Sequence, residues 1–362
     1  MGLMHKIARV KKLVGEFMVL TNPQQQTYFP EAPRKSKAKI IGENLMWVLK
    51  HGEINRHYYM YGLDRKDVDR TQEVLAYKEF TRIRDSRNLR VKGNNFNYAA
   101  VLRDKFVAGQ FFTSIGVRSP KNIALIDKQT ITWLDTMRVE DLNSITGNKD
   151  LYVDGFCKQL AGLQGTGAFL LKIENGNLYV QNKPISVSEF IKLIKGPYIL
   201  QERIIQHESF NVVYADAINT LRIVTFNRNG NIEVFYAAMR VGAGQSTIDN
   251  WSSGGIAIGI DLETGLLKKY GYFKPKYGRR VEVHPDSGLR FENFPVPFLK
   301  ESIELVTSTH RYLYGIHSIG WDVAIDRDGP LIIEANEDWG GGFAMASIPN
   351  FKGRFLNMFS EK

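Results

Sequence analysis

The sequence predicts an α+β protein with a mainly helical, basic N-terminal region followed by a body of short strands. Residues 35–90 contain few Gly or Pro and place apolar side chains three or four positions apart, as in a helix. Beyond residue 150, β-rich runs alternate with turns rich in Gly, Asn and Asp. Residues 1–105 contain 21 Lys and Arg against 11 Asp and Glu, whereas residues 106–362 contain 27 of each, so the net charge of +10 lies entirely in the first third. We therefore divide the chain into a helical basic region, 1–95, and an α+β domain, 96–362.

The expected elements follow in order. After the helical region, a helix over residues 98–115 ends at Gly116, just before Ser119-Pro120. Helices are also expected at 186–194 and 298–314. Strands are expected at 151–158, 168–173, 198–205, 221–226, 233–240, 256–261, 320–325 and 331–335.

The composition indicates a folded, soluble, cytoplasmic protein. Of the 362 residues, 43% are hydrophobic, and 21 Phe and 16 Tyr supply enough apolar area for a large core. The only cysteine, Cys157, excludes an internal disulfide and fits a reducing compartment. No apolar run reaches the roughly 20 residues that a spanning helix needs, and the first 20 residues lack the features of a secretory signal.

The basic N-terminal region is expected either to attract a polyanion or to be an ordinary solvated helical surface. No zinc-finger, helix-turn-helix or RNA-binding motif accompanies the charge, so we expect no specific nucleic-acid partner. Peripheral contact with an anionic membrane or with a glycan intermediate is compatible with it.

Three oxygen-bearing side chains point to a magnesium site. A turn at Asp328-Gly329 joins the strands 320–325 and 331–335 into a hairpin, which brings Asp322 close to Glu334 and Asn336. Glu334 and Asn336 are two residues apart and share a strand face. Carboxylate and amide oxygens suit a hard cation such as Mg²⁺. Acids at strand ends are commonly just solvated, but Glu334 follows three apolar residues, where an unpartnered charge would be costly.

A second group of residues suggests a nucleotide site. Lys158 ends a predicted strand, and a glycine-rich stretch with Gly165 and Gly167 follows it. Backbone N–H groups of such a loop can approach phosphate oxygens while the lysine supplies charge. An ordinary flexible hairpin has the same composition, and the stretch matches neither a P-loop nor a dinucleotide-binding motif.

Polar residues inside apolar strands extend this group. The strand 198–205 contains Gln201, Glu202 and Ile204, which can present backbone groups and an acid to an adenine ring; a solvated edge strand is the alternative. Arg222 and Arg240 each interrupt an apolar strand, where a guanidinium needs an anion. That anion is either a phosphate or the carboxylate of a structural ion pair.

In this order, these residues resemble the ATP-grasp superfamily and, more narrowly, its sugar-transfer-associated (α-L-glutamate ligase-related) proteins. The resemblance covers roughly residues 78–351. It is carried by Lys105, Lys158, the glycine stretch, Ile199 to His207 (ILQERIIQH), Asn219 to Thr225 (NTLRIVT), Asp249 to Gly255, His284-Pro285, Gly320-Trp321-Asp322, Glu334 and Asn336.

The resemblance implies two α+β subdomains that clamp ATP: a small ATP-binding lobe, about 151–210, and a large lobe with the metal site, 211–362. It implies that Lys105 and Lys158 contact the phosphates or ring N7, that Glu202 and its neighbours receive adenine, and that the glycine loop covers the triphosphate. His207 or Glu208 would contact the ribose. Arg222, Arg240 and Asn250 would form the catalytic centre, and Asp322, Glu334 and Asn336 would hold Mg²⁺. The chain departs from many superfamily members after Asn336, where it reads Glu337-Asp338-Trp339-Gly340-Gly341-Gly342.

The activity that this implies is an ATP- and Mg²⁺-dependent carboxylate–amine ligase, forming an amide through an acyl-phosphate, in polysaccharide or surface-glycan modification. Its partners would be ATP, a carboxylate such as an acidic sugar, and an amine. An ATP-dependent phosphotransferase acting on a hydroxyl is the first alternative, and a non-catalytic polyanion-binding module is the second. The roles of His284 and of residues 1–95, and the oligomeric state, stay open.

Overall fold

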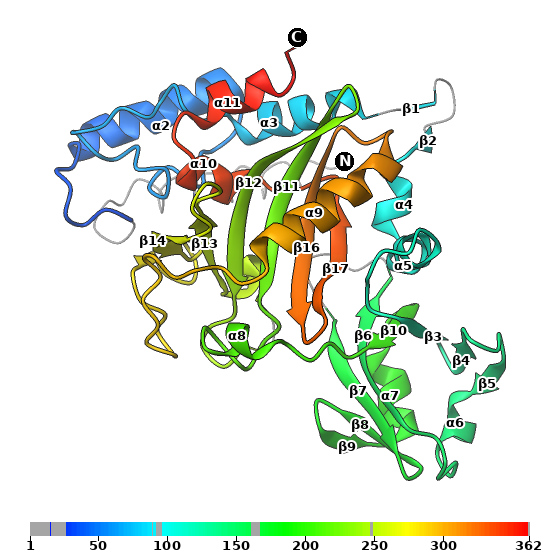
Figure 1. The fold of residues 1–362 in the computed structure, drawn as a ribbon. Coiled ribbons are helices and arrows are strands. Elements are labelled where there is room, and N and C mark those ends of the chain that lie inside the picture. Colours follow the sequence, from blue (N-terminus) through cyan, green and yellow to red (C-terminus); the bar gives the residue numbers. More distant parts are fainter. Residues whose placement is uncertain are drawn as a thin grey trace, which may run out of the picture.

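Two antiparallel sheets form the body of the protein (Figure 1). The computed structural model describes Gly15 and residues 27–88, 90–91, 96–160, 167–246 and 249–360. The smaller lobe contains an eight-stranded sheet of order β5-β4-β3-β10-β6-β7-β8-β9, and the large lobe a seven-stranded sheet of order β15-β14-β13-β12-β11-β16-β17. Within the described residues, no helix is both long and apolar enough to span a bilayer.

The small lobe begins earlier in the chain than the predicted residue 151. Its strands are β3 (Asn122–Asp127), β4 (Thr130–Trp133), β5 (Val139–Asp141), β6 (Val153–Gln159), β7 (Phe169–Glu174), β8 (Asn177–Val180), β9 (Lys183–Ile185) and β10 (Tyr198–Glu202), with helices α6 (Leu142–Ile145) and α7 (Val187–Leu193). Ser186 and Glu189 form a capping box at the start of α7. Cys157 is buried in the lobe's core beside Phe169 and Leu200.

The large lobe contains the predicted hairpin. Its strands are β11 (Thr220–Arg228), β12 (Asn231–Val241), β13 (Ile256–Ile260), β14 (Leu267–Tyr272), β15 (Arg280–Val281), β16 (Ser318–Asp326) and β17 (Gly329–Asn336), with helices α8 (Glu208–Asn211) and α9 (Leu299–His310) and the short 3₁₀ turns η3 (Trp251–Ser253) and η4 (Arg311–Leu313). Figure 1 shows α9 crossing one face of this sheet, where it covers an apolar core.

The N-terminal region packs on the opposite face of the large sheet. Its helices α2 (Lys37–His51) and α3 (Tyr77–Arg84), followed by η2 (Asp85–Arg87), meet the C-terminal helices α10 (Gly342–Ser347) and α11 (Phe351–Asn357) there. The chain continues through β1 (Arg90–Val91) and β2 (Phe96–Asn97) to α4 (Ala100–Arg103) and α5 (Lys105–Ser114), which join the core on the α9 face. Phe80 is fully buried in one core with Phe226 of β11 and Phe355 of α11. The described residues 27–88 therefore share a core with the large lobe instead of forming a separate unit.

Two predicted helices are interrupted. Residues 35–90 are not one helix: α2 ends where Gly52 adopts a left-handed conformation (φ 64°), and turns occupy most of the chain up to α3. The helix expected at 98–115 is broken at Asp104, whose extended backbone ends α4 and whose carboxylate caps α5 by accepting from Phe106 N and Val107 N. Apolar periodicity reports a buried face but does not reveal such breaks.

The structure also gives His284 a role. Its Nε2 donates to the carbonyl oxygen of Gly242 (2.8 Å), and its Nδ1 accepts from the backbone N–H groups of Asp286 and Ser287. The ring is fully buried, and burial lowers its pKa, which keeps it neutral. His284 thus fastens the loop after β15 to the end of β12.

Candidate active site

A row of charged side chains crosses four neighbouring strands of the large sheet. Arg240 lies on β12, Arg222 on β11, Asp322 on β16 and Glu334 on β17. Arg222 is directly opposite Asp322, and Asp322 is directly opposite Glu334. Side chains directly opposite on antiparallel strands share a face, so the strand register alone brings together residues that are far apart in sequence. This is the face that the N-terminal region packs on, because the other face carries α9.

Asp322 is the centre of this row. Arg222 donates to both of its oxygens, Nε to Oδ1 at 2.7 Å and Nη2 to Oδ2 at 2.9 Å, and Arg240 Nη1 donates to Oδ1 at 2.9 Å. Burial raises the pKa of Asp322, but the two guanidinium groups outweigh burial and hold the pKa below its usual value. Asp322 is therefore a charged, oriented carboxylate in an almost fully buried position.

Asp249 and Thr220 complete the group, and the sequence did not single out either as a site residue. Arg240 Nη2 donates to Asp249 Oδ1 at 3.3 Å, and the hydroxyl of Thr220 donates to Asp249 Oδ2. Burial raises the pKa of Asp249, and Arg240 opposes the rise. Two sequence features could have pointed to these residues. Asp249 begins the Asp249-to-Gly255 motif, and Thr220 lies two residues before Arg222, on the same strand face.

The rest of that motif shapes the turn that holds Asp249. Asn250 accepts from the N–H of Ser252 and so caps the turn, and Gly254 has a φ of 107°. A Cβ on Gly255 would lie 2.3 Å from the carbonyl oxygen of Asp249, so only glycine fits there. Within this motif Asp249 contacts Arg240 directly, and the predicted catalytic residue Asn250 follows it at the start of the turn.

Two lysines approach the row from the small-lobe side. Lys105, at the start of α5, has its Nζ 3.6 Å from Glu334 Oε1. The pKa of Lys158 on β6 is lowered to about 8. Burial is the main cause and Lys105 adds to it, whereas the carboxylates of Glu334 and Asp322 oppose the shift. Lys158 thus lies within electrostatic range of Glu334 and Asp322, two of the three predicted metal ligands. Asn336 lies opposite Gly320, two residues beyond Glu334 on the same strand.

The predicted adenine-side residues lie at and beyond the end of β10. Gln201 is buried and donates to Asn122 Oδ1 at 2.9 Å, whereas Glu202 is exposed. Ile204 follows in the connection between the lobes. His207 caps α8 by accepting from Ser209 N, and its ring packs on Phe298 at the start of α9.

Within the described residues, the side chains of Gln201 and His207 contact Asn122, Ser209 and Phe298, none of which belongs to the charged row. Gly167 has a φ of 76°, while Gly165 and the rest of the glycine loop, 161–166, lie outside the described residues.

The donors on this face suit a magnesium nucleotide. Among the described atoms, the donor Arg240 Nε on this face is buried without a hydrogen-bond partner, and so is the acceptor Gln201 Oε1 on the small-lobe sheet; a ligand would relieve either. No cluster of three or more His, Cys, Asp or Glu side chains able to bind a metal occurs in the part of the chain that is described. The predicted metal ligands are two carboxylates and an amide, a partial oxygen shell of the kind that Mg²⁺ completes with water and phosphate oxygens.

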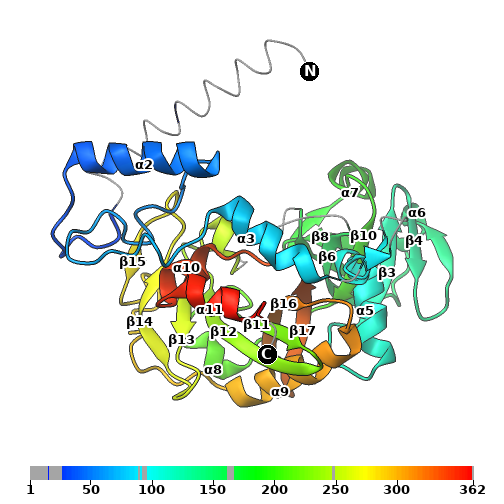
Figure 2. The same ribbon diagram turned by 90° about the horizontal axis from the view of Figure 1, so that it is seen from above.

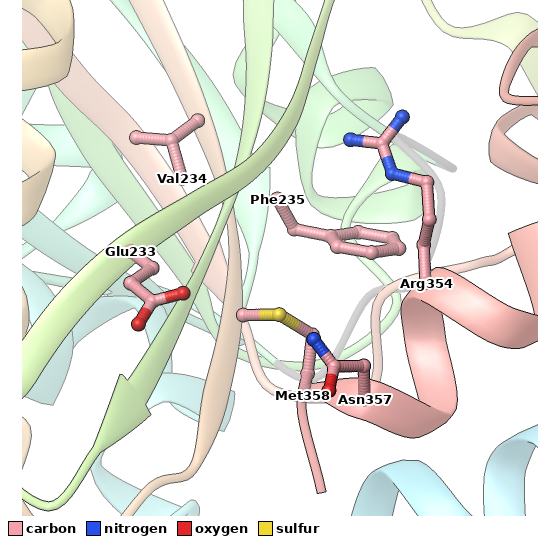
Figure 3. Close-up of a pocket in the computed structure, with 6 residues that line it drawn as sticks. All are labelled: Glu233, Val234, Phe235, Arg354, Asn357 and Met358. Carbon is pink, nitrogen blue, oxygen red and sulfur yellow. The ribbon is translucent and has the colours of Figure 1, made fainter. Parts of the chain in front are cut away.

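A separate pocket of about 200 Å³ lies at the other end of β12 (Figure 3). Its lining residues are Glu233, Val234, Phe235, Arg354, Asn357 and Met358. Figure 3 shows Arg354 of α11 extending beside the ring of Phe235. None of the predicted site residues lines this pocket, so it is distinct from the charged row.

A sequence profile described as sugar-transfer associated ATP-grasp matches residues 84–359. Similar solved structures include N5-carboxyaminoimidazole ribonucleotide synthetase from Thermotoga maritima (13% identity, TM-score 0.39, covering 73% of this chain and 50% of that chain). They also include D-alanyl-alanine synthetase A from Vibrio cholerae (10% identity, TM-score 0.39, covering 73% of this chain and 62% of that chain). A third is L-amino acid ligase from Bacillus licheniformis (15% identity, TM-score 0.36, covering 70% of this chain and 45% of that chain). The chain thus spans about half the length of these proteins. No curated protein matches the sequence.

Proposed function

The chain belongs to the sugar-transfer associated ATP-grasp family, and from this premise we propose that it is an ATP- and Mg²⁺-dependent carboxylate–amine ligase. The profile covers most of the chain, which confirms the predicted family and the ATP-grasp fold. The observation that carries the proposal is the continuous row from Arg240 to Glu334, with Lys105 and Lys158 beside it. A row with both signs of charge can hold a triphosphate and its metal together.

The proposed roles rest on the family resemblance and, for the charged row, are supported by the strand register. Glu334, Asn336 and Asp322 would hold Mg²⁺, which when bound supplies charge neutralisation to the phosphates. Lys105 and Lys158 would contact phosphate oxygens from the small-lobe side, with Gly165 and Gly167 in the covering loop. Gln201, Glu202 and Ile204 would receive the adenine. For the ribose, His207 or Glu208 is proposed, and Asn250 supports the turn next to Arg240.

The proposed reaction has two steps, and the two arginines would stabilise negative charge in both. An oxygen of the substrate carboxylate would attack the γ-phosphorus of ATP, and ADP would leave. The amine would then attack the acyl carbon, lose a proton and displace inorganic phosphate, which leaves an amide. Negative charge on the phosphoryl oxygens must be stabilised during both steps, and Arg222 and Arg240 would be the fixed cations beside these oxygens. Asp322 and Asp249 orient the two guanidinium groups before substrate arrives.

We propose an acidic sugar or a related glycan as the carboxylate and an amino-acid-like compound as the amine. The family's association with sugar transfer and the basic first third of the chain support an acidic, glycan-derived substrate. The proposal places the enzyme in the cytoplasm, in accord with its single, buried cysteine.

The test is a phosphate-release screen in which uronic acids are paired with amino acids in the presence of Mg-ATP. We expect phosphate release only when a carboxylate and an amine are both present, and a product mass equal to their sum less one water. Glu334→Ala should abolish it, whereas the exposed Glu292→Ala should not. A product that carries a phosphoryl group on a hydroxyl would instead establish the phosphotransferase.

A further inference from the structure

The helix α2 exposes an apolar stripe. Leu45, Met46 and Leu49 are 50%, 63% and 71% exposed, which is unusual for three large apolar side chains within five residues. At 100° per residue, Leu45 and Leu49 fall on one line along the helix with Ala38 and Gly42, and Met46 lies beside it. Figure 2 shows α2 at the outside of the molecule, away from both sheets.

Lysines flank this stripe. On the helical wheel Lys37 lies on one side of it, and Lys39 and Lys50 lie on the other. All three side chains are exposed, and none forms an ion pair with a residue in the described ranges. The one acid of the helix, Glu43, is held by Lys35 at 3.0 Å and by the hydroxyl of Tyr58. The outward side of α2 is thus apolar along its centre and positive at its margins.

The inward side of α2 is firmly attached. Ile40 and Asn44 are buried, Ser36 caps the N-terminus by accepting from Lys39 N, and the N–H of Gly52 donates to the carbonyl oxygen of Val48 at the other end. The helix is therefore capped at both ends and anchored through its inward side.

We propose that α2 is a membrane-binding helix that lies in the surface of an anionic bilayer, with Leu45, Met46 and Leu49 inserted between the lipids and Lys37, Lys39 and Lys50 on the headgroups. A helix with an apolar stripe between lysines matches both layers of such a surface. The apolar stripe contacts the acyl chains, and the flanking lysines contact the anionic headgroups. A protein partner with an apolar groove would match the stripe alone. The proposal depends on the surface of α2 and does not depend on the proposed ligase activity.

Vesicle flotation of the full chain tests it, with phosphatidylcholine vesicles that contain or lack phosphatidylglycerol. We expect binding to the anionic vesicles only. The double variant Leu45→Glu with Leu49→Glu should bind at least about tenfold more weakly, because the inserted apolar area is lost. The triple variant Lys37→Gln, Lys39→Gln and Lys50→Gln should bind about 100-fold more weakly to the anionic vesicles, since each lysine near the surface strengthens the binding about fivefold.

A matched control carries Met137→Glu and Val139→Glu, which are 67% and 62% exposed on the small lobe. This variant should bind vesicles like the unmodified chain. If the Leu45 and Leu49 variant floats as well as the unmodified chain, or if the unmodified chain does not float, the proposal is overturned. A change from dimer to monomer in that variant, with no vesicle binding by the unmodified chain, would assign the stripe to contact between copies. Circular dichroism checks that each variant is folded, and ATP turnover without vesicles reports separately on the ligase proposal.

Discussion

Arg222 and Asp322 lie opposite each other on neighbouring strands and are joined by two hydrogen bonds of 2.7 and 2.9 Å, although 100 residues separate them in the sequence. This bidentate pair fixes the plane of the Asp322 carboxylate and leaves Arg240 to bridge from Asp322 to Asp249. The charged row is therefore organised by the sheet itself.

Replacing Asp249 should impair catalysis more than nucleotide binding. Asp249→Asn keeps the shape of the side chain but removes the charge that orients Arg240, so we expect kcat to fall about 10- to 100-fold. The KM for ATP should change by less than about threefold, because the residue is not among those proposed to contact ATP. Steady-state kinetics measure both. The exposed Asp150→Asn is the control, and equal kcat values for the two variants would refute a positioning role for Asp249.

Removing one predicted metal ligand should change the magnesium requirement. Glu334→Gln keeps one oxygen donor but loses the charge, so the Mg²⁺ concentration that gives half-maximal ATP turnover should rise about tenfold or more. The same titration on Glu292→Ala provides the reference. If the magnesium dependence of Glu334→Gln matches that of the unmodified protein, Glu334 is not a ligand.

Two adjacent glycines should respond differently to alanine. A Cβ on Gly341 would lie 2.8 Å from the ring of Phe80, which is fully buried, whereas a Cβ on Gly340 would meet no atom within 4 Å. We expect Gly341→Ala to lower the free energy of unfolding by about 1–3 kcal/mol through overpacking. Gly340→Ala should change it by at most about 1 kcal/mol. Urea unfolding compares them, and equal midpoints would contradict the close packing of this segment on the N-terminal region.

Stability should fall at acidic pH partly through His310. Its Nε2–H donates to Ile316 O (2.9 Å), so its Nδ1 accepts from the hydroxyl of Thr225 (2.7 Å), which in turn accepts from Trp321 Nε1. Burial lowers the pKa of His310 from 6.5 to about 4, so between these values the unfolded chain binds a proton that the folded chain excludes.

The free energy of unfolding therefore decreases as the pH falls from about 6.5 to about 4. In His310→Gln this dependence should be shallower by up to about 1.4 kcal/mol per pH unit, whatever the variant's stability at neutral pH. Urea unfolding at several pH values measures the two slopes. Parallel curves for the two proteins would show that His310 is not held neutral.

The sequence predicted best where the signal is local. The β16–β17 hairpin, the capped helix α7 and the single motifs of the family resemblance all depend on residues close together in the chain. The strands β6, β7, β10, β11, β12, β13, β16 and β17 each lie within a few residues of their expected ranges. The strands β3 to β5, β8, β9, β14 and β15 were missed, and most of them are short and only partly buried.

Long-range pairing could not be predicted in the same way. Arg222 and Arg240 were recognised as needing anions, but that the carboxylates of Asp322 and Asp249 meet them depends on strand register. The packing of the residues after Asn336 could not be predicted either, because it also depends on residues far away in the sequence. Their glycines allow close packing against Phe80 and His57, and those two residues are brought there by the N-terminal region.

The most direct test of the ligase account is isotope transfer from the carboxylate. With glucuronic acid labelled with ¹⁸O in its carboxylate as the acid probe, together with Mg-ATP and an amine that supports turnover, an acyl-phosphate route moves one labelled oxygen into each phosphate released, because that oxygen bridges carbon and phosphorus before the amine displaces it. Mass spectrometry of the phosphate should therefore find one ¹⁸O atom per molecule. Phosphate released without label, or a labelled acid recovered with a phosphoryl group on a hydroxyl, would contradict the account.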